Sequence, residues 1–130
     1  MRDELDKQLC EKYPKIFADR YKPMTETAMC WGIECGDGWY NIIDQLCANI
    51  QSHINWEESR GIAISQVVAE QVKEKFGTLR FYVRGGDDYT DALINMAESM
   101  SGVTCETCGS PGTTGGSGWI RTLCEEHRKK

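Results

Sequence analysis

The chain has 130 residues, which is a typical length for one globular domain. Its hydrophobic content of 40% and charged content of 27% exclude a disordered chain, and no apolar run approaches the roughly 20 residues of a membrane span. Twenty acidic and fifteen basic residues give a net charge of −5. The surface as a whole is therefore a poor match for nucleic acid, although a local basic face stays compatible with it.

Two amphipathic helices are predicted, one on each side of a strand region. Apolar residues recur at helical spacing over residues 37–56, where Asp37 is the expected N-cap. The second helix begins at Asp87 or Asp88 and continues to about Ser101. Its apolar stripe, the side that a globular helix turns toward the core, consists of Tyr89, Ala92, Leu93, Met96, Ala97 and Met100.

Between these helices we predict a β-hairpin. Residues 57–61 are expected to form a turn, after which residues 62–84 have the composition of two strands that turn at residues 76–77. A turn of two or four residues places the same set of side chains on each face of the hairpin. A turn of three residues shifts one strand by one residue, and its side chains exchange faces. In the first case Glu74 lies opposite Leu79, and the core side of the hairpin consists of Val72, Leu79, Phe81 and Val83.

The other face of the hairpin is a candidate binding surface, consisting of Lys73, Lys75, Arg80, Tyr82 and Arg84. Its cations match a phosphate-bearing ligand or an acidic partner, and the tyrosine offers a stacking surface. Glu70 and Glu74 lie close enough to neutralise part of the charge, so an ordinary solvated sheet face is the alternative. Trp39 and Tyr40 form a second candidate beside a helix N-terminus, a natural anion site, although Trp39 also begins an apolar stripe.

The seven cysteines indicate reduced thiols and metal ligation rather than disulfide bonds. Their number is odd and the charged N-terminal residues show no secretory signal, so we expect a cytoplasmic protein. A second cluster can be drawn from Cys30, Cys35, Cys47 and His53. Its spacing suits a metal poorly, because Cys47 and His53 lie six residues apart on different faces of a helix. We interpret these cysteines as free thiols, with a Cys35–His53 nucleophile pair as the alternative.

The strongest motif lies in the last 26 residues, where Cys105-x2-Cys108 and Cys124-x2-His127 are separated by fifteen residues. Zinc prefers four tetrahedral sulfur or nitrogen ligands, and a two-residue gap lets both ligands of a pair bind one ion. Because four ligands are present, we predict one structural Zn²⁺ in a closed module of zinc-ribbon or treble-clef type, without an open catalytic position. Residues 109–118 are expected to form a flexible loop within it.

Together these elements predict an α+β fold in a single domain. Residues 1–104 are expected to form the α+β core, in the order helix, hairpin, helix. Residues 105–130 are expected to form a zinc-binding module that packs on the same domain. The sequence shows no internal repeat and no domain boundary.

Three segments carry a resemblance to known proteins. They are GIECGDGW at residues 32–39, QVKEKFGTLRFY at residues 71–82, and the C-terminal pattern CxxCG…GWxxTLCxxH. In this combination the chain, from about residue 13 to its end, resembles a group of small uncharacterised zinc-binding proteins of bacteriophages, prophages and bacteria. The resemblance implies a zinc-binding protein in a phage or prophage setting, and it implies no activity.

Four functional hypotheses follow. The first is a non-enzymatic binding protein that masks or inhibits a host protein, for example one of host defence, since small phage proteins often act by binding host machinery. The second is a module that sequesters a nucleotide or another phosphate-bearing ligand on the hairpin face. The third is nucleic-acid binding by the basic tail residues, which are Arg121, His127, Arg128, Lys129 and Lys130. An enzyme comes last, because no acid–base pair, nucleophile motif or phosphate loop of known spacing is present.

Overall fold

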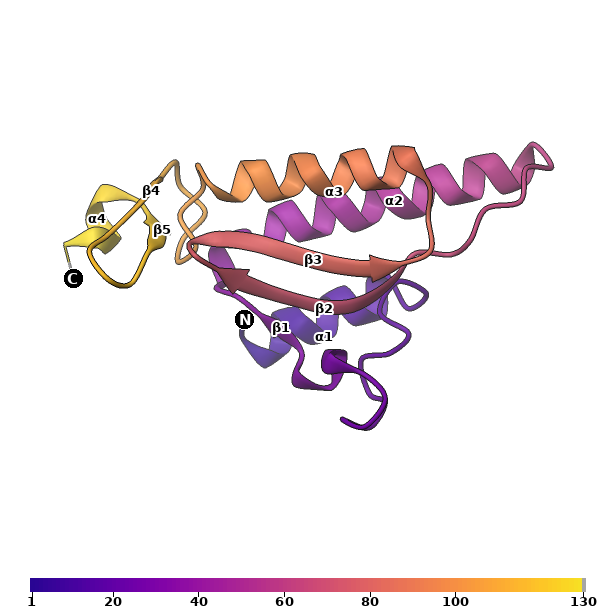
Figure 1. The fold of residues 1–130 in the computed structure, drawn as a ribbon, viewed down its shortest axis with the longest axis horizontal. Coiled ribbons are helices and arrows are strands. Elements are labelled where there is room, and N and C mark those ends of the chain that lie inside the picture. Colours follow the sequence, from indigo (N-terminus) through magenta and orange to yellow (C-terminus); the bar gives the residue numbers. More distant parts are fainter. Residues whose placement is uncertain (130) are drawn as a thin grey trace.

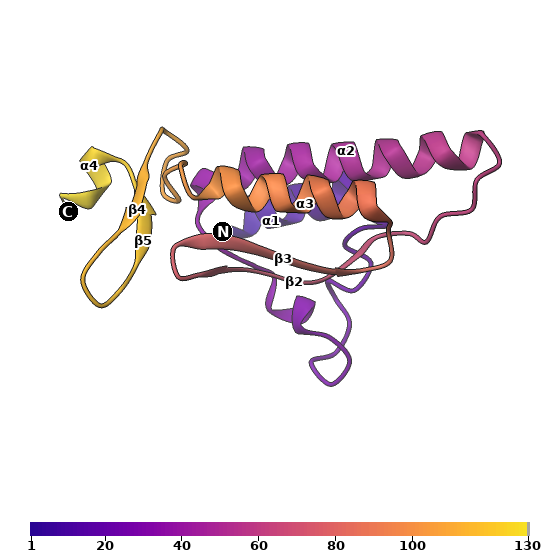
Figure 2. The same ribbon diagram turned by 45° about the horizontal axis from the view of Figure 1, so that its top comes forward.

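The computed structural model describes residues 1–129. Two long antiparallel helices lie over one face of a three-stranded sheet, a shorter helix runs beside them, and a small module with its own hairpin closes one end (Figures 1 and 2). The chain is therefore a single small α+β domain, as predicted. Its elements are α1 (Asp3–Lys12), η1 (Ala28–Trp31), β1 (Ile33–Glu34), η2 (Asp37–Trp39), α2 (Tyr40–Ser59), β2 (Val68–Lys75), β3 (Thr78–Arg84), α3 (Asp88–Ser101), β4 (Thr113–Gly115), β5 (Arg121–Leu123) and α4 (Glu125–Arg128).

The helix α2 buries the stripe predicted for it but differs from the prediction at both ends. Residues 37–39 form the separate 3₁₀ turn η2, and α2 continues to Ser59, so most of the predicted turn at residues 57–61 is helical. The prediction of Asp37 as N-cap is wrong. Its carboxylate instead accepts a hydrogen bond from the backbone N–H of Arg2 at 2.9 Å and pairs with the Arg2 guanidinium at 2.8 Å.

The helix α3 begins where predicted but buries a different face. The Asp87 carboxylate accepts from the backbone N–H of Thr90 at 3.0 Å, which caps the helix. Of the predicted stripe only Ala97 is buried. The other buried residues of α3 lie outside the stripe, and two of them are polar; they are Thr90, Ile94 and Ser101. The reason lies in strand β3, because the Leu79 N–H donates to the Ser101 hydroxyl at 2.8 Å. Polar side chains of α3 thus satisfy backbone donors of an edge strand.

The sheet confirms the predicted register of the hairpin. Glu74 lies opposite Leu79 and Val72 lies opposite Phe81, with residues 76–77 as a two-residue turn. The strands are shorter than expected, since residues 62–67 form no strand and a bulge follows Ala69. The predicted core side is buried at Val72, Leu79 and Phe81 and half-buried at Val83.

The core lies between the sheet and the helices and reaches the C-terminal module. The edge strand β1 pairs parallel to β2, a contact that the sequence did not predict. Phe17 meets Phe81 edge-on, with ring centroids 6.4 Å apart. Trp39 is fully buried, and its indole N–H donates to the Thr104 carbonyl at 2.8 Å, so it links the core to the module.

Within residues 1–129 no helix is both long and apolar enough to span a bilayer.

Candidate metal centre

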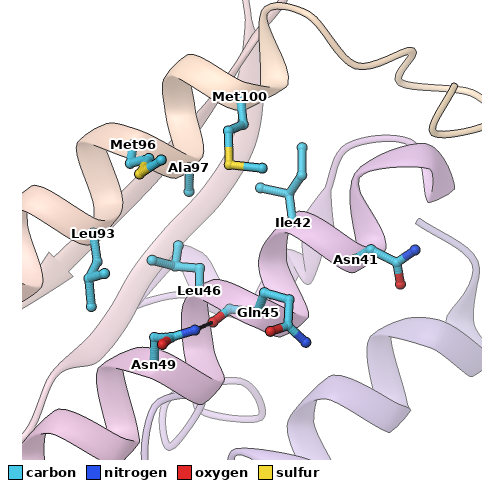
Figure 3. A pocket seen from close by; sticks show the side chains of 9 residues that line it. All are labelled: Asn41, Ile42, Gln45, Leu46, Asn49, Leu93, Met96, Ala97 and Met100. Atoms are coloured by element: carbon cyan, nitrogen blue, oxygen red, sulfur yellow. Dashed lines mark hydrogen bonds between the residues drawn. The ribbon is translucent and has the colours of Figure 1, made fainter. Parts of the chain in front are cut away.

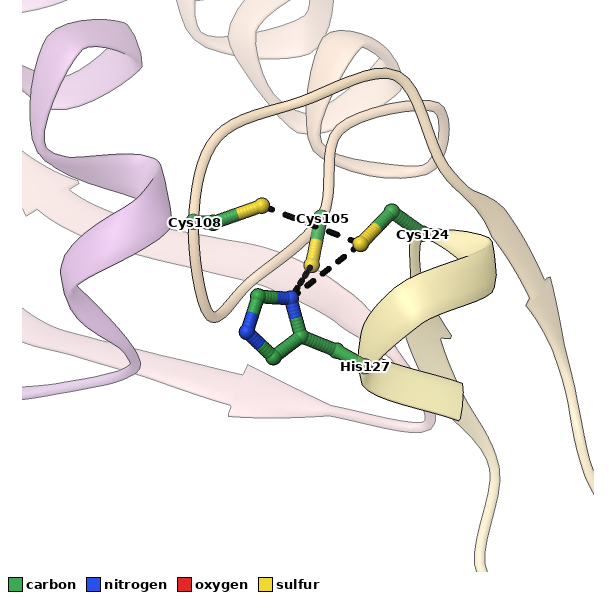
Figure 4. Close-up of side chains that lie close together, drawn as sticks. All are labelled: Cys105, Cys108, Cys124 and His127. Atoms are coloured by element: carbon green, nitrogen blue, oxygen red, sulfur yellow. Dashed lines mark hydrogen bonds between the residues drawn. The ribbon is translucent and has the colours of Figure 1, made fainter. Parts of the chain in front are cut away.

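Four side chains with metal-binding atoms converge at the end of the molecule (Figure 4). Cys105 and Cys108 lie on a turn that is closed by the Gly109 N–H, which donates to the Cys105 carbonyl at 2.9 Å. Gly109 has a φ of +83°, a conformation that glycine adopts without strain. Cys124 directly follows β5, and His127 lies on the short helix α4 that begins there. The four ligand atoms lie within 4.8 Å of one another, as the spacing of the motif predicted.

The distances between the ligand atoms fit one tetrahedral ion. Cys108 Sγ lies 3.8 Å from Cys124 Sγ, and His127 Nδ1 lies 3.7 Å from Cys105 Sγ and 3.1 Å from Cys124 Sγ. With Zn–S bonds of about 2.3 Å and Zn–N bonds of about 2.0 Å, tetrahedral ligands are about 3.5–3.8 Å apart. The first two distances match this spacing, whereas His127 Nδ1 lies closer to Cys124 Sγ than the ideal. Three sulfurs and one imidazole are a donor set of structural zinc sites. The residues are therefore placed to hold one Zn²⁺ with protein ligands at all four positions.

The surroundings of Cys105 favour the thiolate form that a metal requires. Burial raises the pKa of this thiol, but hydrogen bonds from the backbone N–H groups of Cys124, Cys108 and Thr107 outweigh burial and lower the pKa to about 6. Metal ligation by cysteine needs a deprotonated sulfur. The turn thus favours the thiolate of Cys105. The hydrogen bond from the backbone N–H of His127 lowers the pKa of Cys124, but burial and the neighbouring thiols of Cys105 and Cys108 outweigh it, so that this pKa is raised.

The zinc knuckle, residues 105–109, docks on two glycines that precede α2. The Gly38 N–H donates to the Glu106 carbonyl at 2.7 Å, and the Gly36 N–H donates to the Glu106 carboxylate at 2.8 Å. A Cβ on Gly38 would overlap the Cys105 carbonyl oxygen, and a Cβ on Gly36 would overlap the Glu106 carbonyl oxygen. The Gly-Asp-Gly segment is therefore explained by a close contact between two backbones.

The hairpin turn of the main sheet makes the second contact with the module. Thr122 on β5 is fully buried, and its hydroxyl donates to the Gly77 carbonyl at 2.6 Å. The Thr114 hydroxyl on β4 lies 2.6 Å from that of Thr122 and donates to the Gly102 carbonyl, just after α3, at 2.9 Å. The module is thus fixed both to the β2–β3 turn and to the end of α3.

The segment 109–118 is more ordered than its composition suggested. It contains β4, which pairs antiparallel with β5. The Arg128 guanidinium of α4 donates to three backbone carbonyls of this small hairpin. The expectation of a flexible loop throughout is wrong, because β5 and Arg128 supply the hydrogen-bond partners that a glycine-rich segment lacks by itself.

The basic tail residues are mostly engaged inside the module. Besides Arg128, the Arg121 guanidinium lies 5.0 Å from the centroid of the Trp119 ring, and Lys129 pairs with Glu125 at 3.3 Å. Lys130 lies outside the described residues. The described basic residues of the tail thus have neighbours within the module, and nucleic-acid binding stays a prediction.

On the predicted binding face of the hairpin, Arg84 is tied to neighbouring carboxylates. It donates to both oxygens of Asp19, at 2.6 and 3.1 Å, and lies 3.9 Å from Glu70. Hydrogen bonds from Arg84 and Lys22 lower the pKa of Asp19 to about 2. Arg84 therefore acts as a link between β3 and the loop before η1.

The remaining members of this face have fewer partners. Among residues 1–129, no ion pair within 4.0 Å involves Lys73, Lys75 or Arg80, and the buried Nε of Arg80 has no hydrogen-bond partner. Tyr82 is 43% exposed. Three cations and one aromatic ring are thus available on this side of the sheet.

Trp39 and Tyr40, the candidate anion-site residues, take part in packing. Trp39 is fully buried, as described above. The Tyr40 hydroxyl donates to the Gln8 side-chain oxygen at 3.1 Å, which joins α2 to α1. The structure therefore gives both side chains a structural role at this end of α2.

The cysteines outside the centre do not form a second metal cluster. Burial raises the pKa of Cys35 to about 12 and that of Cys47 well above its ordinary value. His53 is hydrogen-bonded to the Asp87 carboxylate at 2.8 Å and stacks on the Tyr89 ring with centroids 4.1 Å apart. In the described part of the chain, the C-terminal four residues form the one cluster of histidine, cysteine and carboxylate groups that is suited to a metal.

Comparisons with known proteins add no relative to these observations. No protein-family model matches the chain, and neither a curated protein nor a solved structure matches it. The resemblance to phage and prophage proteins therefore stays a prediction.

Proposed function

We propose that this protein is a non-enzymatic, zinc-stabilised binding protein that masks or inhibits a protein partner. The observation that carries the proposal is Phe76, a strained and exposed residue in the hairpin turn where the metal module docks. The set of four protein ligands supports it, because a fully ligated zinc stabilises structure instead of activating water or substrate.

Phe76 occupies a backbone conformation that its side chain disfavours. It has a φ of +53°, and no other non-glycine residue in the described chain has a positive φ. A left-handed conformation costs an L-residue about 1–2 kcal/mol, and asparagine or glycine is the usual residue at this position of a two-residue hairpin turn. The ring gains little burial in return, since Phe76 is 68% exposed. Strain without a benefit to the fold is typical of a functional contact.

The metal module places further side chains beside this turn. We name the resulting surface the aromatic tip; it consists of Lys75, Phe76, Trp119, Ile120 and Arg121. A Cβ on Gly77 would lie 3.2 Å from Ile120 Cγ2, which shows how closely the two loops approach. Trp119 is 73% exposed. Exposed aromatic rings with neighbouring cations are typical of the residues that dominate binding at protein interfaces.

The resemblance to phage and prophage proteins supports the biological setting of the proposal. We place the chain in the cytoplasm of a bacterial host, where its seven unlinked cysteines stay reduced. The partner is a host factor, and defence proteins are the first class to test. The partner has an apolar pocket for the tip with acidic groups opposite Lys75 and Arg121, and its basic groups lie farther out, where they meet the rest of a chain of net charge −5.

Affinity capture from a nuclease-treated host lysate tests this function. The wild-type chain retains one host protein in stoichiometric amount, and Trp119→Ala loses it because the tip is truncated. Trp31→Ala is the matched control, since Trp31 is 62% exposed and lies outside the tip. An empty wild-type eluate, or equal capture by both variants, contradicts the proposal.

One observation favours a phosphate-bearing ligand as a second candidate. Lys73, Lys75 and Arg80 lack ion-pair partners among residues 1–129 and share a face with the exposed Tyr82. A nucleotide that binds only the folded chain raises the melting temperature. The double variant Lys73→Glu/Arg80→Glu abolishes that rise. A panel of nucleotides without any thermal shift, or a shift that the double variant retains, argues against this candidate.

A further inference from the structure

The outer face of the α2–α3 pair is rich in exposed apolar side chains, among which Tyr89 stacks on His53 of α2. Tyr89, Met96 and Met100 belong to the stripe expected to face the core, yet they are 55%, 65% and 46% exposed. Helix α3 turns other residues to the sheet, since Ser101 and Glu98 accept hydrogen bonds from backbone N–H groups of β3. Exposed methionines and aromatic rings in one region are typical of a surface that binds another chain.

A groove of about 300 Å³ follows the seam between the two helices (Figure 3). Its α3 side is formed mainly by Leu93, Met96 and Met100, and its floor on α2 by Ile42 and Leu46. None of the nine residues that line it is charged. In a chain with 27% charged residues, this makes the seam distinct from the rest of the surface.

The exposed side of α2 continues this uncharged surface along the helix. Its residues recur at intervals of three or four and are Asn41, Gln45, Asn49, Ser52 and Trp56. Trp56 is 59% exposed and lines a second hollow together with Tyr89 of α3 and with Glu57, the one carboxylate in that hollow, whose side chain is 18% exposed. Depletion of charge together with methionine and aromatic residues is the composition of interface centres.

We propose that a second copy of this chain packs on this face, so that α2 and α3 of two copies form a four-helix contact around a two-fold axis. In such a contact each surface meets itself. Amide side chains carry both donors and acceptors, so a row of amides is complementary to an identical row, which a row of like charges is not. Two chains of net charge −5 repel each other elsewhere, whereas this uncharged face lets them approach.

The dimensions of the face set the strength of the dimer. Residues 41–56 of α2 span about 24 Å, and two helices side by side are about 20 Å wide. The face therefore offers about 500 Å² per copy, or about 1,000 Å² in total, which is below the roughly 1,200 Å² of stable interfaces and in the range of weak ones. We expect a concentration-dependent dimer that leaves the aromatic tip of each copy free, so this inference goes beyond the proposed function and does not depend on it.

Sedimentation equilibrium over a wide range of concentration tests the dimer. The wild-type mass rises from 14.7 kDa toward twice that value with concentration. Met96→Glu buries an unpaired charge in the contact and raises the dissociation constant by at least about tenfold. Gln45→Glu does the same with a side chain of equal size. Since Met96 is 65% exposed, the fold survives the substitution, which circular dichroism and zinc content verify.

Asn95→Glu is the matched control for Met96→Glu. It adds the same charge one residue away on α3, at an exposed position that does not line the groove, and it leaves the dissociation constant unchanged. A wild-type mass of 14.7 kDa at every concentration overturns the dimer and leaves this face to a different protein. A dimer that survives Met96→Glu and Gln45→Glu also overturns the inference, because it uses another surface.

Discussion

At the scale of single residues, Gly36 and Gly38 determine whether the metal module can dock. The backbone of the zinc knuckle occupies the space into which a Cβ would project at either position. Glu106, seventy residues later in the chain than Gly36, binds one backbone N–H with its carboxylate and another with its carbonyl. These glycines are therefore required by a tertiary contact and not by the local turn alone.

We expect Gly38→Ala to lower the free energy of unfolding by about 1–3 kcal/mol, as overpacking of a close contact does. It should also weaken zinc binding, because the new Cβ overlaps the carbonyl of the ligand residue Cys105. Urea titration measures the first effect and competition with a chelator measures the second. Gly115→Ala is the matched control, since a Cβ there meets nothing within 4 Å. Equal effects of the two substitutions speak against the docking argument.

Phe76→Asn has the opposite expected effect on stability. Asparagine tolerates the left-handed conformation that Phe76 adopts, and the exposed ring loses only a weak contact with the Lys75 ammonium, 5.7 Å from its centroid. We therefore expect the free energy of unfolding to rise by about 0.5–1 kcal/mol, while capture of the partner falls. Urea titration beside the capture assay measures both. A less stable variant means that the ring supports the fold, which removes the reason for assigning it to binding.

At the scale of elements, the sequence predicts those whose pattern is local. The alternation over residues 79–84 predicts the register of β2 and β3 once the turn has two or four residues, because a pleated strand places every second side chain on one face. The two-residue turn at residues 76–77 decides between the two possible pairings. β1 has two residues, too few for any pattern, and it exists because β2 offers it backbone partners. The two Cys/His pairs were equally visible, since each pair is set by a two-residue gap.

Other features depend on contacts between segments far apart in the sequence. The apolar stripe of α3 gave the wrong buried face, because backbone N–H groups at the edge of β3 require Ser101 and Glu98 as acceptors. The hydrophobic periodicity of α3 does not show that the edge of β3 needs hydrogen-bond acceptors from this helix. The aromatic tip was missed for a similar reason, as residues 77 and 120 become neighbours only when the module docks. A phenylalanine before glycine in a hairpin turn was the one local signal that pointed to it.

The link between β3 and the loop before η1 makes stability depend on pH. The pKa of Asp19 falls from 3.8 to about 2 in the folded chain because Arg84 and Lys22 donate to its carboxylate. A folded-state pKa below the unfolded one means that the ionised group stabilises the fold above about pH 4 and that this contribution is lost as the pH falls from about 4 to about 2. This pH dependence of stability is caused by protonation of a single carboxylate, that of Asp19.

We expect Asp19→Asn to remove this dependence. Urea titrations of the wild type and the variant should differ by a constant free energy of unfolding above about pH 5, and the difference should shrink below about pH 4 as the wild-type carboxylate is protonated. Loss of zinc in acid affects both proteins alike, so the difference isolates Asp19. A difference that stays constant down to about pH 2 shows that the Arg84 link does not stabilise the fold.

At the scale of the whole molecule, the metal module and the α+β layers are joined through a few buried contacts. Trp39 binds Thr104, Gly38 binds Glu106, and Thr122 binds Gly77 through hydrogen bonds of 2.6 to 2.8 Å. The module itself has short strands and a short helix and buries few apolar side chains. We therefore expect its order to depend on the metal, whereas the layers of helices and sheet have a core of their own.

Removal of the metal should accordingly unfold part of the molecule and leave the rest. We expect elemental analysis to find about one zinc per chain and Cys105→Ser to release it. Hydrogen exchange should then lose protection over residues 105–129, while α2 and β2 keep theirs because their apolar residues belong to one buried core outside the module. Cys30→Ser, a half-buried thiol outside the metal cluster, is the control and should retain both zinc and protection. A purified chain that contains no metal and still protects residues 105–129 would refute the view that zinc holds the aromatic tip in place.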